Sequence, residues 1–417
     1  MEINEFIPRY IKKIINRFES TGHEAYAVGG CVRDRLLGMQ PSDWDMCTSA
    51  EPEEVCRILS EYKIIPTGIK HGTVTVITPD CTVEITTFRG DGEYIDSRHP
   101  KSVRFIKSLS EDLKRRDFTI NAMAYSERSG IIDLYNGISD LSNKVLRCVG
   151  EPNIRFKEDA LRIMRALRFS AVYDLAVEEK TSDAMHFCRT ELKKISAERI
   201  SAELEKMLTL SKNPGKAFAD YFDILAVVFP EFEDYQKCYR AQNQVLSVID
   251  SLKPDLCLRL CGLMYFFGLN GISGCEYTQA AYSALKHLKL TKKHFKRIMN
   301  LINFQSQDLP DTLAKTRMFI NNYGVQLCSD LAAWKKAIGF TEDAALTEGF
   351  IDSINRNALC CSVSDLAING RDLTLIGIKD GKKIGEVLNR LLFEVINKNI
   401  KNDKTVLLKE SAKYLQG

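Results

Sequence analysis

The stretch AYAVGGCVRDRLLGMQPSDWDMCT, residues 25–48, decides the fold that we predict for this chain. It begins with a short apolar run, Ala25–Val28, which is typical of a buried strand and ends at Gly29 and Gly30. A second strand is predicted at Ser42–Thr48. The stretch therefore predicts part of a β-sheet, with a glycine turn directly after its first strand.

Two aspartates of the second strand are the candidate catalytic and metal-binding residues. Residues two apart on a strand project from the same face, about 6.6 Å apart, so Asp43 and Asp45 are expected to lie together near the glycine turn. Two close carboxylates disfavour each other's ionisation unless a cation lies between them. Two Mg²⁺ ions, about 3.5–4 Å apart, activate an attacking oxygen and stabilise a leaving one. Glu84, in TVEITTF, is expected to add a third carboxylate from a neighbouring strand.

The residues around the turn have the composition of a phosphate site. Gly29 and Gly30 allow close approach of a ligand to the backbone. Arg33 and Asp34 follow about one helical turn later, where the guanidinium group can meet a triphosphate. A paired aspartate motif alone is common on solvated strands, and a Gly-Gly turn alone is less specific still. Their combination at this spacing favours a nucleotide site.

The character of the chain changes near residue 150. Before it, strand patterns alternate with helices: a hairpin is predicted from Thr73–Thr78 and Thr82–Phe88, and an amphipathic helix over Ile3–Phe18, with Pro8 in its first turn, is expected to cover the sheet. After Gly150 the strand patterns end, and only helices are expected. The clearest of these are Asp159–Val172, Ser196–Leu210, Pro254–Phe267, Tyr277–Leu288 and Lys382–Ile396.

Composition sets wide limits on the class of protein. With 417 residues, the chain is expected to form two or more domains. The net charge of +3, from 58 basic and 55 acidic residues, neither requires nor excludes a nucleic-acid partner. No apolar run approaches the roughly 20 residues that span a membrane. The 13 cysteines are odd in number and lack zinc-type spacing, which indicates a reducing, cytoplasmic location.

Three more motifs follow in order: KRRDFTINAMAY (114–125), RFKEDALRIMRALRF (155–169) and AERISAELEKML (197–208). With GGCVRDRLLGMQPSDWDMCT, they resemble the class II tRNA nucleotidyltransferase and bacterial poly(A) polymerase family. The resemblance implies an α+β fold, with a small mixed-sheet nucleotidyltransferase head followed by an all-helical body and tail. The expected domains are the head with the catalytic carboxylates (1–150), a helical neck that recognises the base (151–215), a helical body (216–350) and a tRNA-binding helical tail (351–417).

The second motif is expected to bind the sugar and phosphates of a nucleotide. A carboxylate can accept a hydrogen bond from a ribose 2′-OH, and the resemblance assigns this role to Asp117. It also places Asn121 in the nucleotide site. Arg116, next to Asp117, is expected to contact phosphate. The alternative for the Arg-Arg-Asp triplet is an ion pair on a helix surface.

The third motif is expected to read the base. Asp159 and Arg162 lie three residues apart, which on one helix would place them on the same face. A carboxylate accepts from the exocyclic amine of cytosine or adenine, and a guanidinium donates to the ring nitrogen beside it. Uracil and guanine present an oxygen where the carboxylate lies, so this pair selects C and A. The resemblance assigns this role to these residues, and Arg165 and Arg168 are expected to contact triphosphate or RNA, or to pair with glutamates.

The predicted function is stepwise addition of CCA to the 3′ end of tRNA from CTP and ATP, with release of pyrophosphate and with Mg²⁺ as cofactor. The enzymatic alternatives are an A-adding tRNA nucleotidyltransferase and a poly(A) polymerase; a third is a non-catalytic RNA-binding protein. The polar stretch Gly90–Val103 is expected to be a mobile loop of the kind that, by resemblance, CC-adding specialists lack. No membrane partner is expected, and the sequence does not indicate an oligomeric state.

Basic residues in the second half of the chain are candidate RNA contacts, although a merely solvated face is an equally good explanation for them. They are Lys286, Lys289, Lys292, Lys293, Lys296, Arg297, Lys379, Lys382 and Lys383.

Overall fold

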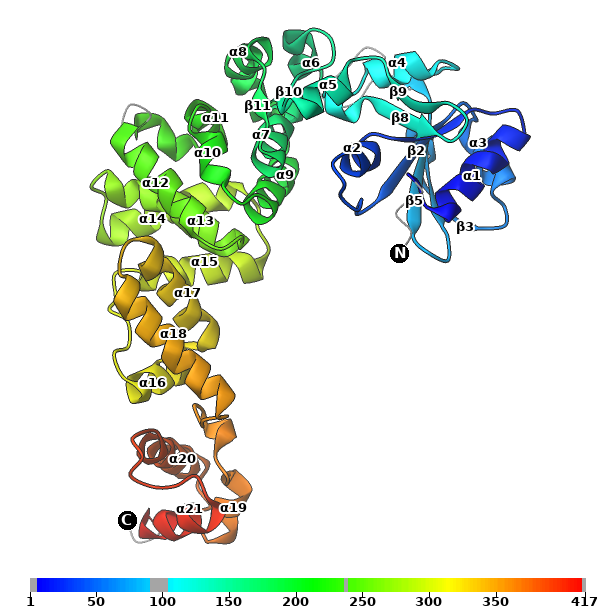
Figure 1. Ribbon diagram of the computed structural model, residues 1–417. Coiled ribbons are helices and arrows are strands. Elements are labelled where there is room, and N and C mark those ends of the chain that lie inside the picture. The colour runs from blue at the N-terminus through cyan, green and yellow to red at the C-terminus, as the bar shows by residue number, and fades with distance from the viewer. Residues whose placement is uncertain (1–5, 91–103, 236–238, 415–417) are drawn as a thin grey trace. The chain divides into compact units, whose positions relative to one another are not determined.

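The computed structural model describes residues 6–90, 104–235 and 239–414 and divides the chain into two compact units, Met1–Lys237 and Cys238–Gly417. In Figure 1 the strands of the main sheet lie in the blue and cyan part of the chain, and the light-green to red part is helical. The predicted α+β class with a helical second part is confirmed. The finer division at residues 150, 215 and 350 stays a prediction.

One seven-stranded sheet, in the order β3-β4-β5-β2-β1-β8-β9, forms the centre of the first unit. Strands β2 and β5 pair in parallel and all other neighbours are antiparallel, so the sheet is mixed. The hairpin predicted around residues 79–80 is confirmed as β4 and β5. The strands are β1 (Ala25–Val28), β2 (Trp44–Thr48), β3 (Lys63–Gly68), β4 (Thr73–Ile77), β5 (Thr82–Thr87), β8 (Met123–Ser126) and β9 (Gly130–Asp133).

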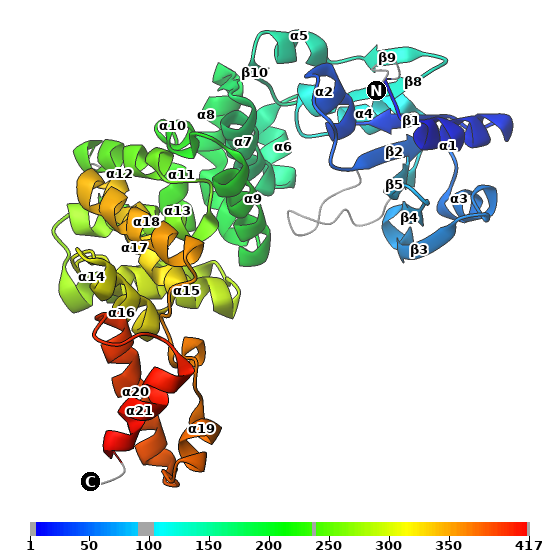
Figure 2. The same cartoon turned by 60° about the horizontal axis from the view of Figure 1, so that its bottom comes forward.

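The alternation of side chains along β2 places the sheet between two apolar layers. Trp44 and Met46 point into a core that includes Ile11 and Phe18 of helix α1 and Val55 of helix α3. Figure 2 shows the same unit turned by 60°. Because side chains alternate between faces, Asp45 and Cys47 face the opposite side, where Cys47 packs in a second, smaller cluster.

The remaining elements of the first unit connect the sheet to a group of helices. The two short strand pairs are β6 (Arg89–Gly90) with β7 (Arg104–Phe105), and β10 (Val145–Leu146) with β11 (Ala176–Val177). The helices are α1 (Arg9–Ser20), α2 (Gly30–Leu36), α3 (Pro52–Ile58), α4 (Leu109–Lys114), α5 (Gly137–Ser142), α6 (Pro152–Glu158), α7 (Leu161–Tyr173), α8 (Glu179–Cys188), α9 (Ala197–Leu210), α10 (Pro214–Phe218) and α11 (Phe222–Val228). Short 3₁₀ turns are η1 (Ile69–His71), η2 (Thr119–Asn121), η3 (Arg189–Lys194) and η4 (Pro230–Tyr235).

Three local predictions for the first unit need comment. The helix predicted to start at Ile3 begins at Arg9, with Pro8 in extended conformation just before it. The expectation that strands end at Gly150 was wrong, because β11 pairs in parallel with β10. The loop predicted at Gly90–Val103 lies, apart from its first residue, outside the described residues.

The second unit is helical throughout the part that the structure describes. Its helices are α12 (Tyr239–Ser251), α13 (Leu256–Leu269), α14 (Gly274–His287), α15 (Lys292–Phe304), α16 (Leu313–Tyr323), α17 (Val325–Ala337), α18 (Thr341–Arg356), α19 (Gly370–Leu375), α20 (Gly381–Ile396) and α21 (Lys404–Ser411), with 3₁₀ turns η5 (Val363–Asp365) and η6 (Ala412–Tyr414).

Burial in the second unit explains two of its features. Helix α13 is apolar on nearly all sides, and its Cys257 and Cys261 are buried in the core, as a packing role predicts. The buried Arg317 of α16 donates to the carbonyl groups of Cys360 and Ile396, which ties α16 to the end of α20. Among the described helices, none combines the length and apolar character needed to cross a bilayer.

Candidate active site

The predicted carboxylates meet at the start of β2. Asp45 lies on β2 directly beside Glu84 of β5 in the parallel register, and Asp43 lies in the bend just before β2. Asp43 accepts a hydrogen bond from Ser42 Oγ at 3.1 Å. Within the described residues, no group of three or more His, Cys, Asp or Glu side chains is arranged to hold a metal ion. The three carboxylates are therefore neighbours, without forming a closed cage.

The charge on Asp45 reflects this crowding. Asp45 is exposed at its surface, yet the protein packed around it partly desolvates its carboxylate, which raises the pKa of Asp45, and the negative charge of Asp43 raises it further, to about 6. Arg116 opposes this rise and Glu84 adds to it. A carboxylate with so high a pKa is stabilised in its charged form by a nearby cation. The oxygen donors present are those that hard divalent cations prefer, so the residues fit a metal ion such as Mg²⁺.

The glycine turn requires a residue without a side chain. Gly29 has φ of 79° and ψ of −125°, a backbone conformation that L-residues rarely adopt. A Cβ atom at this position would lie 2.8 Å from Nη1 of Arg116. Gly30 begins helix α2 directly after it. The turn therefore holds the Arg116 guanidinium group against the backbone, beside the carboxylates.

We expect Gly29→Ala to lower the free energy of unfolding by about 1–3 kcal/mol, because the left-handed backbone is strained for alanine, and to weaken CTP binding because Cβ displaces Arg116. Urea denaturation and equilibrium binding of CTP measure the two effects. Gly130→Ala is the matched control, because Gly130 also has a positive φ, of 65°, but an added Cβ would meet open space. The Gly130→Ala variant should lose stability and keep its CTP affinity. Equal CTP affinity in the Gly29→Ala and Gly130→Ala variants would contradict the role of the turn.

Arg33 is more enclosed than the sequence predicted. It is buried, and its guanidinium group donates to Asp34 Oδ1 at 2.7 and 2.9 Å, to Asn121 Oδ1 at 2.6 Å and to the Tyr173 hydroxyl at 2.5 Å. It also lies 4.3 Å from the ring centre of Tyr173. These contacts join α2 to the end of α7. The triphosphate role of Arg33 stays a prediction, and the geometry shows in addition a role in positioning Asn121.

Asp117 is held by donors on every side. Its Oδ1 accepts from the Phe118 backbone N–H at 2.8 Å and from Asn121 Nδ2 at 3.0 Å, and its Oδ2 accepts from Arg165 Nε at 2.8 Å. Burial acts to raise the pKa of Asp117, but Arg165 and the hydrogen bonds outweigh it and hold that pKa far below its usual range. Asp117 is thus ionised and fixed in orientation, as an acceptor for a hydroxyl group must be.

Arg165 and Arg168 pair with a glutamate, which is the alternative that their sequence context left open. Arg168 Nε donates to Glu203 Oε2 at 2.5 Å, and Arg165 lies 3.6 Å from Glu203 Oε1. Arg165 also pairs with Asp117. Glu203 lies on α9, within the motif at residues 197–208, so these bonds fasten α7 to α9.

Asp159 and Arg162 do not lie on one helix, which corrects the predicted geometry. Helix α6 ends at Glu158, Asp159 is extended with φ of −145°, and α7 begins at Leu161. The break has a local cause: Asp159 Oδ1 accepts from the Leu161 backbone N–H at 3.1 Å, as short polar side chains do at helix starts. The Arg162 backbone N–H still bonds to the Asp159 carbonyl at 3.1 Å, so the two residues remain neighbours across the break.

The side chains of this pair are both held by other residues. Arg199 of α9 binds both carboxylate oxygens of Asp159, at 2.8 and 3.3 Å. Arg162 donates to Glu158 Oε2 at 2.9 Å and to the carbonyl groups of Arg155 at 2.8 Å and Arg115 at 3.2 Å. Both side chains of the pair are therefore fixed in orientation by neighbouring residues.

Three family models match the chain in succession: the Poly A polymerase head domain over residues 25–147, the probable RNA and SrmB-binding site of polymerase A over 174–236, and the putative tRNA nucleotidyltransferase domain 2 over 274–410. A CCA-adding enzyme of Ligilactobacillus salivarius is 36% identical over 99% of this chain and 99% of its own. The chain belongs to the family of CCA-adding enzymes. The predicted resemblance and the predicted class of enzyme are confirmed.

Solved structures of this family share the fold. A CCA-adding enzyme of Bacillus stearothermophilus, crystallised with CTP, is 28% identical and has a TM-score of 0.75 over 97% of this chain and 96% of its own. A CCA-adding enzyme of Thermotoga maritima complexed with tRNA is 22% identical, with a TM-score of 0.67 over 99% and 97% of the two chains, and shows the fold alone. CCA-adding enzymes use divalent metal ions.

The predicted site did not include Arg199, Glu158, Tyr173 or Asp112. Arg199 contacts Asp159, Glu158 contacts Arg162, and Tyr173 contacts Arg33. Arg199 lies 40 residues from its partner and Tyr173 lies 140 residues from Arg33. Spacing along the chain carries no signal for such distant pairs. Only the contact between Glu158 and Arg162, four residues apart in the third motif, could have been predicted from the sequence.

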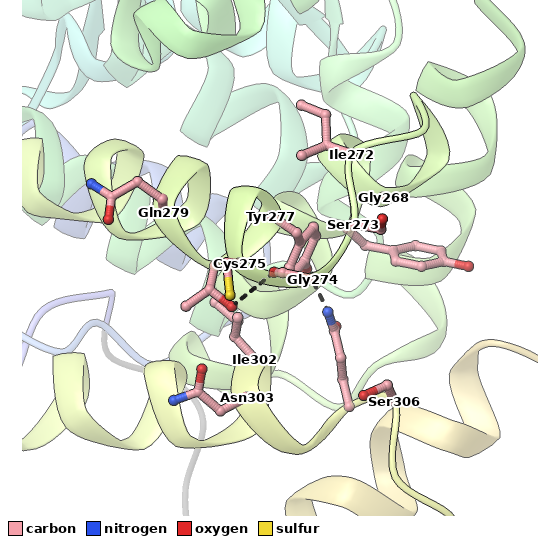
Figure 3. Close-up of a pocket in the computed structure, with 13 residues that line it drawn as sticks. Gly268, Ile272, Ser273, Gly274, Cys275, Tyr277, Gln279, Ile302, Asn303 and Ser306 are labelled. Atoms are coloured by element: carbon pink, nitrogen blue, oxygen red, sulfur yellow. Dashed lines mark hydrogen bonds between the residues drawn. The ribbon is translucent and has the colours of Figure 1, made fainter.

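The second unit has its own cavity and basic residues. Arg297 pairs with Asp255 and Asp330, at 2.9 and 2.7 Å, so this candidate RNA contact has a structural partner. A cavity of about 660 Å³ lies at the start of α14 (Figure 3), where the Tyr277 hydroxyl donates to Gln305 at 3.3 Å. None of the predicted site residues lines it.

Proposed function

We propose that the chain adds cytidine, cytidine and adenosine in turn to the 3′ end of tRNA, using CTP and ATP and releasing pyrophosphate. The observation that carries this proposal is the proximity of Asp45 to Asp43, Glu84 and Arg116, beside the Gly29 turn. Full-length similarity to CCA-adding enzymes supports tRNA as the substrate. The match of residues 274–410 to a tRNA nucleotidyltransferase domain favours tRNA over a poly(A) product.

The proposed cofactor is Mg²⁺, held by Asp43 and Asp45 with help from Glu84. When bound, it supplies Lewis-acid stabilisation of the charge that develops on the reacting phosphate and its neighbouring oxygens. The protein binds and orients the other groups. Asp43 and Asp45 would hold the metal, and Arg116 would neutralise phosphate charge.

The nucleotide is proposed to lie between the head and helix α7. Asp117, fixed by Asn121 and Arg165, accepts from the ribose 2′-OH. Asp159 accepts from the amine of cytosine or adenine, and Arg162 donates to the adjacent ring nitrogen. Because Arg199 and Glu158 already orient these two side chains, the site rejects bases that present oxygen to Asp159. We also propose that the protein acts in the cytoplasm, since that is where a reduced thiol-rich chain is stable.

The affinity for metal should depend on pH near the raised pKa of Asp45. A carboxyl group with a pKa of about 6 binds a proton below that pH, and the proton competes with the cation. We expect Mn²⁺ affinity, measured by its paramagnetic signal, to be constant above pH 7 and about tenfold weaker at pH 5 than above pH 7. Asp45→Asn should lack this dependence. Equal affinity at pH 5 and pH 7 in the unmodified protein would contradict the assignment.

Single-nucleotide incorporation tests the proposed reaction. Each labelled NTP is supplied alone, with Mg²⁺, to tRNA transcripts that end before CCA, after CC and after CCA. We expect CTP to extend only the first transcript and ATP only the second, with no addition of UTP or GTP. Addition confined to ATP on the CC-ended transcript would instead identify an A-adding enzyme.

A further inference from the structure

Asp112 is a buried carboxylate that lies outside the motifs and has no role in the site described so far. It lies on the short helix α4 and its side chain is 0% exposed. A buried carboxylate is costly unless positive charges and donors surround it. Asp112 has such partners: burial raises its pKa, but Arg115 and Arg116 outweigh this effect and hold the pKa of Asp112 below its usual range.

The two oxygens of Asp112 bind different arginines. Oδ1 accepts from Nε and Nη2 of Arg115 at 2.9 and 2.7 Å, and also faces the Arg89 backbone N–H at 3.3 Å. Oδ2 accepts from Nη2 of Arg116 at 3.4 Å. Arg115 and Arg116 lie three and four residues after Asp112, at the end of its helix. One carboxylate thus anchors both arginines of the Arg-Arg-Asp motif.

Among the described residues, Asp112 is the hydrogen-bond partner of the Arg116 guanidinium group. Its Nε is buried and has no hydrogen-bond partner among the described residues, and its Nη1 lies against the Gly29 turn. The charge of Arg116 also lowers the pKa of Asp45. Arg116 also interacts electrostatically with Asp45 and Asp117, but its hydrogen bond is to Asp112. Asp112 therefore holds the Arg116 guanidinium group against the Gly29 turn.

Two further contacts connect Asp112 to the rest of the site. The Arg89 backbone lies in β6, so the carboxylate also fastens this strand to α4. The carbonyl group of Arg115 accepts from both Arg155 and Arg162, and Arg162 belongs to the proposed base-reading pair. Loss of Asp112 would therefore act directly on Arg116, the proposed phosphate contact, and on Arg162 only indirectly, through the Arg115 backbone.

We propose that Asp112 is a positioning residue for the triphosphate: it holds Arg116, and through Arg115 the adjoining backbone, in the geometry that binds the phosphates of either CTP or ATP. This inference rests on the proposed function, in which Arg116 contacts phosphate. It predicts an effect that depends on phosphate and not on the base.

The test compares equilibrium binding of CTP, ATP and cytidine to the full chain, with Mg²⁺ present. Cytidine has the base and ribose but no phosphate. Asp112→Asn is expected to lower the affinities for CTP and ATP by the same factor, about tenfold. The affinity for cytidine is expected to change by less than about twofold. Asp112→Glu keeps the charge but adds a methylene group at a fully buried position; for it we expect the same selective loss of CTP and ATP affinity, smaller than that of Asp112→Asn. An equal loss of affinity for cytidine and CTP, or an unchanged affinity for CTP in both variants, would overturn the proposal.

Two reference variants separate the possible failures. Asp330→Asn removes another buried carboxylate that pairs with an arginine, Arg297, and should lower the melting temperature without changing CTP affinity. Arg116→Met tests the phosphate contact itself. If Arg116→Met binds CTP normally, the phosphate role under the proposed function is wrong. If Arg116→Met loses CTP affinity while Asp112→Asn does not, the positioning role of Asp112 is wrong and the proposed function stands.

Discussion

Asp45→Ala is expected to lower the rate of CTP incorporation by about 10³-fold, because a Lewis-acid metal contributes several kcal/mol and each 1.36 kcal/mol is tenfold in rate. Asp45 is the carboxylate that has both Asp43 and Glu84 as neighbours, so its loss leaves the metal ion with too few ligands. Binding of tRNA should change little, since it depends mainly on phosphate contacts elsewhere. Single-turnover incorporation and filter binding of tRNA measure the two effects.

Asp80→Ala provides the matched control for this variant. Asp80 is an exposed carboxylate in the turn between β4 and β5 of the same sheet. The Asp80→Ala variant should incorporate CTP at the normal rate. An Asp45→Ala protein that retains more than about a tenth of normal activity is incompatible with the metal assignment.

The second large effect is on the choice of base. We expect Asp159→Ala to reduce the preference for CTP over UTP by roughly ten- to a hundredfold, since a well-placed polar pair contributes about 1–3 kcal/mol of discrimination. The carboxylate that favours an amine over a carbonyl oxygen is lost, while Arg162 remains held by Glu158. The ratio of kcat/KM for CTP and UTP, on a transcript that ends before CCA, measures this preference.

Asp183→Ala is the control for base choice, because Asp183 is an exposed carboxylate on the neighbouring helix α8. It should keep the normal preference. If Asp159→Ala lowers kcat/KM for all four nucleotides by the same factor, then Asp159 supports the local fold and does not read the base. The same measurement on Arg199→Gln would show whether its bidentate contact with Asp159 contributes to that preference.

Local patterns in the sequence were sufficient to predict the sheet around the carboxylates. The strand at Ala25–Val28 and the hairpin of β4 and β5 followed from apolar alternation and turn residues, because these signals act between near neighbours. For Gly29 the sequence predicted only the close approach of a ligand, and the structure shows two other reasons for glycine, the positive φ and the nearby Arg116.

Helical periodicity failed at Asp159 because it ignores capping. The run RFKEDALRIMRALRF fits one helix by pattern, but the Asp159 side chain binds the Leu161 backbone N–H and separates α6 from α7. The contacts that hold the site together could not be predicted from local sequence patterns. Arg33 reaches Tyr173 and Asp159 reaches Arg199, and these pairs depend on how α7 and α9 pack against the head.

The measurement that tests the central claim most directly is sequencing of the 3′ ends produced from a tRNA that lacks CCA, with all four NTPs and Mg²⁺ present. We predict that extended ends read C, CC or CCA, that they accumulate as CCA, and that extension stops there. Long adenosine tails, adenosine added without the two cytidines, or frequent uridine and guanosine would contradict a CCA-adding site built on Asp43, Asp45, Asp159 and Arg162.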